Sequence, residues 1–244
     1  MLNYKIERLL FALLWITLIC LFSFAIPPQT VTLLVQYQYT MSSLILTALI
    51  FYLYTKIRNK QVLNVINRYL TMNEFEKCNL YLEKCIRRQP KVFWLKFQKL
   101  MMIALKGEIT QFKSYSDIIK KDKRVRKNQN LVTIEKFELI FEFLVDGEAK
   151  KTDNCSLKNS YLDKTLYLIC NQSSLQYSEI ISIAFDIYNS PYLLYKSISA
   201  MLLANAYYKL NDLNNANLFN LKAKEFAPSN ETLYCLEKFL NSLN

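Results

Sequence analysis

The stretch Ser197–Asn230, SISAMLLANAYYKLNDLNNANLFNLKAKEFAPSN, holds the clearest pattern in this sequence. Its apolar residues recur every three or four positions, which predicts two helices. Asn211-Asp212 marks the turn between them. Pro228 ends the second helix, because proline disfavours a helical conformation in the residue before it. Small residues that let the two helices approach closely stand at Ala204, Ala216 and Ala223. The stretch therefore predicts an antiparallel helix pair.

Residues 59–92 repeat this pattern, with a turn at Asn73 and an end at Pro90. Cys78 and Cys85 stand where the first stretch has two alanines. They are seven residues apart and share one helix face, so we expect both thiols to pack in the core.

Other parts of the chain follow the pattern less regularly. Gly107 lies 34 residues after Asn73, so 93–126 is expected to form another helix pair. The register is lost between Gly147 and Pro191, where helices are expected near 160–170 and 175–189. A last helix over about 231–243 is expected to cover the end of the stack. The whole chain has two glycines and five prolines, which argues against sandwiches, barrels and doubly wound sheets. The predicted fold class is all-α.

The Ser197–Asn230 unit resembles a tetratricopeptide repeat, a helix pair of 34 residues, and 59–92 fits the same template. The matching positions in the first of these are Leu203, Ala204, Tyr207, Asn211-Asp212, Ala216, Ala223 and Pro228. Asn220 departs from the template, which has a large apolar residue there, and Phe219 beside it is expected to compensate. The resemblance implies an α-solenoid of TPR-like helix pairs.

Tetratricopeptide arrays are typically protein- or peptide-binding scaffolds, with a concave groove lined by the first helix of each unit. By this resemblance, the peptide-binding groove would be lined by Lys60, Leu63, Asn67, Trp94, Phe97, Met101, Met201, Asn205 and Tyr208. Asparagines there suit hydrogen bonds to an extended peptide backbone, and the aromatic and methionine side chains suit an apolar anchor. The competing interpretation is that Trp94, Phe97 and Met101 pack against a neighbouring helix.

Residues 1–58 are predicted to form a transmembrane hairpin. Residues 9–26 carry no charge and are just long enough to cross the hydrocarbon core. Pro27-Pro28 ends this span, and a second uncharged stretch covers about 33–54. The alternative is that the first span is a cleaved signal peptide, because Ser23-Phe24-Ala25 resembles a cleavage site.

The charges around the hairpin predict its orientation. Basic residues flank the two spans at Lys5, Arg8, Lys56, Arg58 and Lys60, while the loop between the spans has no charge. The positive-inside rule then places both termini, and the repeat domain 59–244, on the cytoplasmic side of the cell membrane.

Positive charge is concentrated in one segment. Residues 84–127 carry 14 Lys and Arg against 3 Asp and Glu, in a chain of net charge +11. The segment ends in a dense run: Lys120, Lys121, Lys123, Arg124, Arg126 and Lys127. Such a segment suits an anionic membrane or an acidic protein. Nucleic acid is not expected, because the segment begins only about 30 residues after the second span. The plainer interpretation is a solvated helix face.

No catalytic pattern stands out, so we expect no enzyme, cofactor or metal site. The chain has no histidine, its six cysteines form no Cys-x-x-Cys pair, and its two glycines are too far apart for a phosphate loop. Glu135, Glu138 and Glu142 share a helix face without a local basic partner and are expected to be solvated.

Three functions stay open at this point. The first is a membrane-anchored adapter or scaffold, and the second is a peptide-sensing signalling or immunity protein that uses the same groove. The third, less favoured, is a membrane-bound enzyme without a familiar motif.

Overall fold

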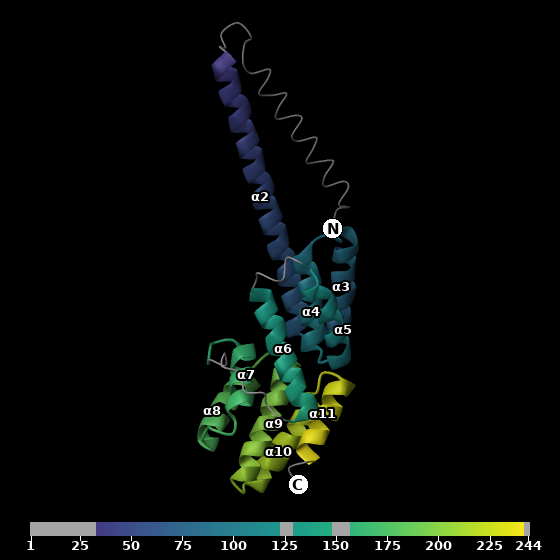
Figure 1. The fold of residues 1–244 in the computed structure, drawn as a ribbon, viewed down its shortest axis with the longest axis vertical. Coiled ribbons are helices and arrows are strands. Elements are labelled where there is room, and N and C mark those ends of the chain that lie inside the picture. The colour runs from purple at the N-terminus through teal and green to yellow at the C-terminus, as the bar shows by residue number, and fades with distance from the viewer. Residues whose placement is uncertain (1–32, 123–128, 148–156, 242–244) are drawn as a thin grey trace. The chain divides into compact units, whose positions relative to one another are not determined.

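The computed structural model describes residues 33–122, 129–147 and 157–241 (Figure 1). All regular structure within these ranges is α-helical, which confirms the all-α prediction for the described part of the chain. The helices are α2 (Leu33–Thr71), α3 (Phe75–Arg88), α4 (Phe93–Leu105), α5 (Ile109–Lys120), α6 (Gln129–Asp146), α7 (Tyr161–Asn171), α8 (Tyr177–Tyr188), α9 (Leu193–Lys209), α10 (Leu213–Glu225) and α11 (Asn230–Asn241).

Contacts divide the chain into two compact units, Met1–Val65 and Ile66–Asn244. In the first unit, α2 continues through the cluster of basic residues near position 58, where the apolar stretch ends. Lysine and arginine are good helix formers, so the loss of apolar character does not end the helix. Between residues 41 and 57, α2 exposes large hydrophobic side chains at Met41, Leu44, Ile45, Leu46, Leu49, Ile50, Phe51, Tyr52, Leu53, Tyr54 and Ile57.

Among the residues that could be searched, no helix is both long and apolar enough to cross a membrane. The predicted span 9–26 lies outside the described residues. The predicted span 33–54 falls within α2.

Three turns of the second unit share one geometry. Asn73, Gly107 and Asn211 have positive φ angles of 56°, 69° and 59°. In each turn, the N–H of that residue donates to the carbonyl three residues back, and the next N–H donates to the carbonyl five residues back, at 2.9 to 3.4 Å. This is the Schellman motif, which needs a residue that tolerates a left-handed backbone, usually glycine or asparagine. All three turns lie where the sequence predicts them.

An acidic residue follows each of these turns and begins the next helix. Glu74, Glu108 and Asp212 are the N-cap residues of α3, α5 and α10. Of the three, Asp212 is the one whose side chain caps its helix, by accepting the backbone N–H of Asn215 at 3.2 Å. The same local structure is therefore built three times, and the first two copies are 34 residues apart.

The region in which the sequence pattern lost its register is also helical. α7 and α8 lie close to the expected ranges 160–170 and 175–189, which confirms both helices. They pack on each other, and both pack on α9. α9 also contacts α10 and α11, so most of its side chains are buried.

Aromatic residues fill much of this core. Phe219 of α10 is 7% exposed, and its ring centroid lies 5.5 to 5.8 Å from those of Phe185, Tyr188 and Tyr207. Phe219 thus fills the space that Asn220 does not, as expected from the sequence. The thiols of Cys78 and Cys85 are buried on one face of α3, which confirms their predicted packing role.

The last helix packs on the preceding helix pair, as expected, and it also contacts a helix much earlier in the chain. α11 packs against α9 and α10 but also against α6 (Figure 1). The ring centroids of Phe143 in α6 and Phe239 in α11 are 5.7 Å apart. Lys238 donates a hydrogen bond to the backbone oxygen of Val145 at 2.9 Å.

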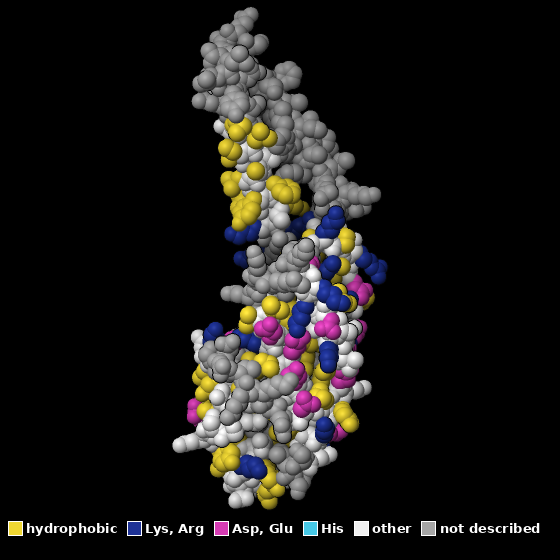
Figure 2. All heavy atoms as spheres, viewed as in Figure 1, with side chains coloured by type: hydrophobic (Ala, Val, Ile, Leu, Met, Phe, Trp, Pro, Cys, Tyr) yellow, Lys and Arg dark blue, Asp and Glu magenta, His cyan; other side chains and the backbone are white. Residues whose placement is uncertain are grey.

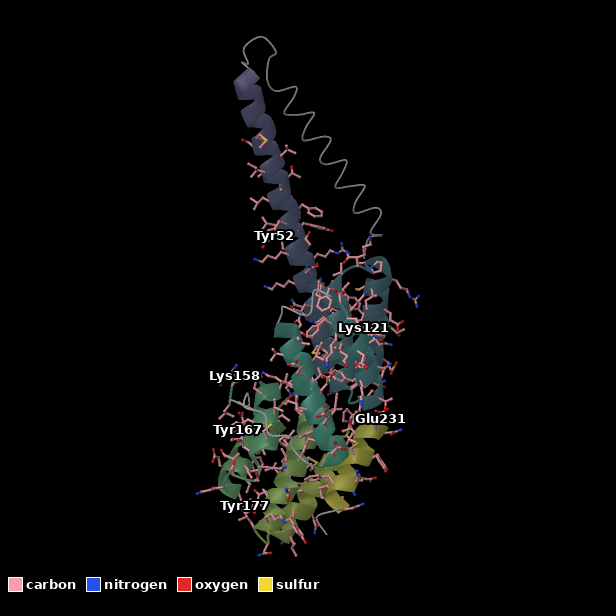
Figure 3. The ribbon with its side chains drawn as sticks, viewed as in Figure 1. Tyr52, Lys121, Lys158, Tyr167, Tyr177 and Glu231 are labelled. Carbon is pink, nitrogen blue, oxygen red and sulfur yellow. The ribbon has the colours of Figure 1, made fainter. Side chains whose placement is uncertain are left out.

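The start of α11 also forms hydrogen bonds with the turn between α4 and α5. The bonded residues are more than 120 positions apart in the sequence. The hydroxyls of Ser229 and Thr232 donate to the carbonyl of Gly107 at 2.7 and 2.9 Å. The backbone N–H of Thr110 donates to Glu231 at 2.9 Å, so Glu231 caps the start of α5 (Figure 3). We call this set of contacts the Gly107 clasp.

Gly107 has no space for a side chain. A Cβ atom there would lie 2.1 Å from the Thr232 hydroxyl oxygen and 2.9 Å from Pro228 Cγ. At Gly147, which also has a positive φ, the nearest atom would be 4.0 Å away.

Gly107→Ala is expected to lower the free energy of unfolding by about 3 kcal/mol, from backbone strain together with the clash. Gly147→Ala, the matched control, adds strain alone and should cost about 1 kcal/mol. Denaturant unfolding of the purified protein in detergent measures both. Thr232→Ala in the Gly107→Ala background should recover part of the loss. Equal losses at the two glycines would contradict the clasp.

Candidate functional site

The groove residues predicted on α4 lie on one side of that helix. Trp94, Phe97 and Met101 are all half-buried. Phe97 stacks on Phe93, with ring centroids 6.3 Å apart. The opposite side of α4 is deeply buried, for example at Ile103. This face is therefore partly accessible and partly packed.

The residues predicted on α9 are placed differently. Met201 is fully buried, so it belongs to the core and does not line an open groove. This corrects the prediction, and the reason is that four other helices pack on α9. Asn205 and Tyr208 are half-buried. The side-chain oxygen of Asn205 is buried without a hydrogen-bond partner.

The predicted groove is distributed over separate parts of the chain. Lys60, which is exposed, and Leu63, which is half-buried, belong to the first unit, whereas exposed Asn67 belongs to the second. Within the second unit, α4 packs chiefly on α3 and α5, whereas α9 packs on α7, α8, α10 and α11. The three predicted sets therefore do not share one set of neighbouring helices.

The basic run at 120–127 is only partly described. Lys120 is half-buried, and its ammonium lies 2.6 and 2.7 Å from the two carboxylate oxygens of Glu138 in α6. Its charge is therefore neutralised within the protein. Lys121 is exposed. Lys123, Arg124, Arg126 and Lys127 lie outside the described residues.

The same contact corrects the expectation for the acidic face of α6. Glu138 is not merely solvated, because it also accepts a hydrogen bond from the Ser116 hydroxyl at 3.2 Å. Its basic partner comes from α5, across an interhelical contact that local sequence does not show. Glu135 is exposed, as expected.

Lysines of α4 neutralise the carboxylates of α3. Lys99 lies 3.2 Å from Glu83. Lys106 lies 2.9 Å from Glu76 and 2.7 Å from Glu108, and its hydrogen bond to Glu108 raises its pKa. These residues line a cleft of about 180 Å³ between α3, α4 and α5. Its charges are largely satisfied by one another, so the cleft does not require a ligand.

A second buried charge cluster joins α6 to α7. Lys136 pairs with Asp163, which also accepts a hydrogen bond from the Ser160 hydroxyl at 2.5 Å. Ser160 is the N-cap residue of α7 and accepts the Asp163 N–H at 3.1 Å. Burial alone would raise the pKa of Asp163, but the hydrogen bonds from Lys136 and Ser160 outweigh it and lower the pKa. The cluster therefore fixes the position of α7 on α6.

Sequence reasoning missed an exposed apolar surface on α10. Leu210, just before the helix, and Leu213, Leu218 and Leu221 are each about half exposed or more. Ala216, Phe219 and Ala223 occupy the buried side of α10. Asn214 and Asn217 are the polar residues exposed among the leucines. The spacing of these leucines, on the side opposite the alanines, is the signal that could have found the surface.

Chemistry at the described cysteines is disfavoured by burial. Burial raises the pKa of the Cys78 thiol to about 11, so it is protonated at neutral pH. The described part of the chain contains no group of three His, Cys, Asp or Glu residues placed to hold a metal ion.

Asp163→Asn is expected to lower the free energy of unfolding at pH 7 by about 1 to 2 kcal/mol, because it leaves Lys136 half-buried without its partner. The stabilisation by Asp163 is present above its unfolded pKa of about 3.9 and is lost as the pH falls through the lower folded value. The difference in the free energy of unfolding between the variant and the unsubstituted protein should therefore shrink below about pH 4. Asp186→Asn is the matched control, because Asp186 is 55% exposed where Asp163 is 14%, so water can take its place beside Lys164 and the change should cost under about 0.5 kcal/mol. Thermal unfolding across pH measures both, and a deficit that does not depend on pH would contradict the assignment.

Comparisons of the chain with protein-family models, with curated proteins and with solved structures gave no significant match. Its function must therefore be inferred from its own residues.

Proposed function

We propose that this protein is a membrane-anchored adapter, in which an N-terminal hairpin holds a TPR-like helical domain that binds a protein partner. The proposal has three parts, which are the anchor, the repeat architecture and the binding surface. Each part has its own support.

The anchor is supported by the sequence of residues 9–26 and by the exposed side chains of α2. Leaving many large apolar side chains in water is costly, at about 25 cal/mol for each Å². α2 exposes Ile45, Phe51 and Ile57 by more than half each. An apolar environment around this part of α2 would remove that cost. We therefore place residues 33–54 in the bilayer with 9–26, and both termini on the cytoplasmic side.

The repeat architecture is supported by the three shared Schellman turns. Asn73 and Gly107 are one repeat length apart, and Asn211 forms the same turn in the unit that resembles a tetratricopeptide repeat best. The identical hydrogen-bond pattern argues that these helix pairs are copies of one unit. Helix-pair arrays commonly serve as binding scaffolds.

The binding surface is the observation that carries the proposal. The four leucines of the α10 surface form a largely apolar face, and the charged residues Lys224 and Glu225 follow Leu221 on the same side of the helix. Exposed apolar patches of this kind mark interaction sites. Because α9 is covered by its neighbours, the outer side of α10 offers a partner more apolar area than Met201 or Asn205 does. We therefore assign partner binding to the α10 surface.

The double variant Leu213→Asn, Leu221→Asn is expected to abolish partner binding without unfolding the protein. Exposed substitutions change stability by only about 0.5 kcal/mol. The measurement is affinity purification from detergent-solubilised membranes with partners identified by mass spectrometry, and enrichment should fall about tenfold or more. Ile118→Asn on α5 is the matched control, because Ile118 is 63% exposed and Leu221 68%.

A photo-crosslinking residue at position 221 should capture the same partner directly, and one at position 118 should not. If both substitutions leave enrichment unchanged and position 221 captures nothing, the α10 surface is not the binding site. A secreted or transported peptide as the most enriched ligand would favour a sensing role over a scaffold.

A further inference from the structure

The outward side of α3 differs in kind from the α10 surface. Leu80, Lys84, Arg87 and Arg88 line one shallow depression on it, together with Glu83. Their spacing of four, three and one residues places them on the same side of an α-helix. Leu80 is 67% exposed, and the Arg87 side chain is 83% exposed. Figure 2 shows Lys and Arg side chains gathered over this helix.

The carboxylates that could neutralise this side of α3 are engaged elsewhere. Glu83 accepts a hydrogen bond from Lys99 of α4 at 3.2 Å, and its distance from Arg87 is a longer 3.8 Å. Glu76 accepts a hydrogen bond from Lys106 of α4 at 2.9 Å. Because α4 lysines satisfy both acids, the outward side of α3 keeps an excess of positive charge.

We propose that this outward side of α3, the basic α3 face, docks on an anionic bilayer surface. The inference rests on the proposed anchor, because a tethered chain keeps its helical domain near a membrane. It refines the sequence-based expectation for residues 84–127 by assigning the contact to α3, since Lys120 at the far end of that segment is paired with Glu138.

The chemistry of the face favours lipid over an acidic protein. One exposed leucine is surrounded by long basic side chains, whose apolar stems can lie along the headgroup region while their charged ends reach phosphate groups. The depression on α3 has no aromatic side chain, one of the residue types that commonly anchor protein interfaces. Each basic residue near an anionic surface strengthens association about fivefold. Three such residues bind a free domain to the membrane only weakly. A tethered domain stays near the membrane, so the same three residues are enough to keep its α3 face on the lipid surface.

The test uses the full chain in nanodiscs of phosphatidylcholine, with or without about 30% phosphatidylserine. Lysines are acetylated briefly and quantified by mass spectrometry. Lys84 should be labelled about threefold less or lower in anionic discs, and it should recover near 1 M salt, where screening acts within about 3 Å. Exposed Lys113 of α5 and Lys209 of α9 are internal controls and should not change.

The double variant Arg87→Gln, Arg88→Gln should restore Lys84 labelling in anionic discs, whereas the α10 variant Leu213→Asn, Leu221→Asn should not. Equal labelling of Lys84 in both kinds of disc overturns the inference, and so does uniform protection of all lysines. Protection of Lys84 in native membranes but not in anionic discs would assign the face to an acidic protein instead. A chain that fails to enter nanodiscs contradicts the anchor, and adding it to preformed vesicles of the same compositions then tests the face separately.

Discussion

The close approach of α11 to Gly107 is the contact on which the rest of the helical domain depends. A left-handed turn without a Cβ atom lets the Thr232 hydroxyl approach the Gly107 carbonyl, and any side chain would force α11 away. With α11 in place, its remaining length packs on α6, α9 and α10. The turn of the second helix pair, α4 and α5, is thereby attached to the last helix, so the helix pairs do not form an open array.

The turns of this fold could be predicted because their causes are local. A left-handed residue or a proline acts within a few positions, so Asn73, Gly107, Asn211 and Pro228 mark the helix ends directly in the sequence. The Gly107 clasp could not be predicted, because its partners are more than 120 residues apart and nothing near Gly107 indicates Thr232. The burial of Met201 follows from the packing of α8 and α10 on α9, whereas a template of isolated repeats places that residue in an open groove.

The number of basic residues in segment 84–127 is clear from the sequence, but which of them are neutralised by ion pairs is not. Lys99, Lys106 and Lys120 each form an ion pair with a glutamate of a neighbouring helix. These pairings depend on which helices pack together, which composition does not reveal. Apart from those three lysines, Lys84, Arg87 and Arg88 of α3 form the densest group of basic residues in the described part of this segment, and Lys91, Lys96, Lys113 and Lys121 are spread along the rest of it.

The two exposed surfaces of the helical domain therefore suit different kinds of partner. The α10 surface combines leucine with asparagine, and the charges beside it, Lys224 and Glu225, are paired with Glu237 and Lys222, so a protein can cover it without leaving a charge buried and unpaired. Fully removing one such leucine from water is favourable by about 1.5 to 3 kcal/mol, and this gain hardly depends on salt. The basic α3 face gains little from burial and much from nearby anions, so its strength falls steeply with ionic strength. An adapter that must hold a membrane loosely and a partner firmly needs one surface of each kind, since a single surface combining charge and leucines would let lipid and protein compete for it.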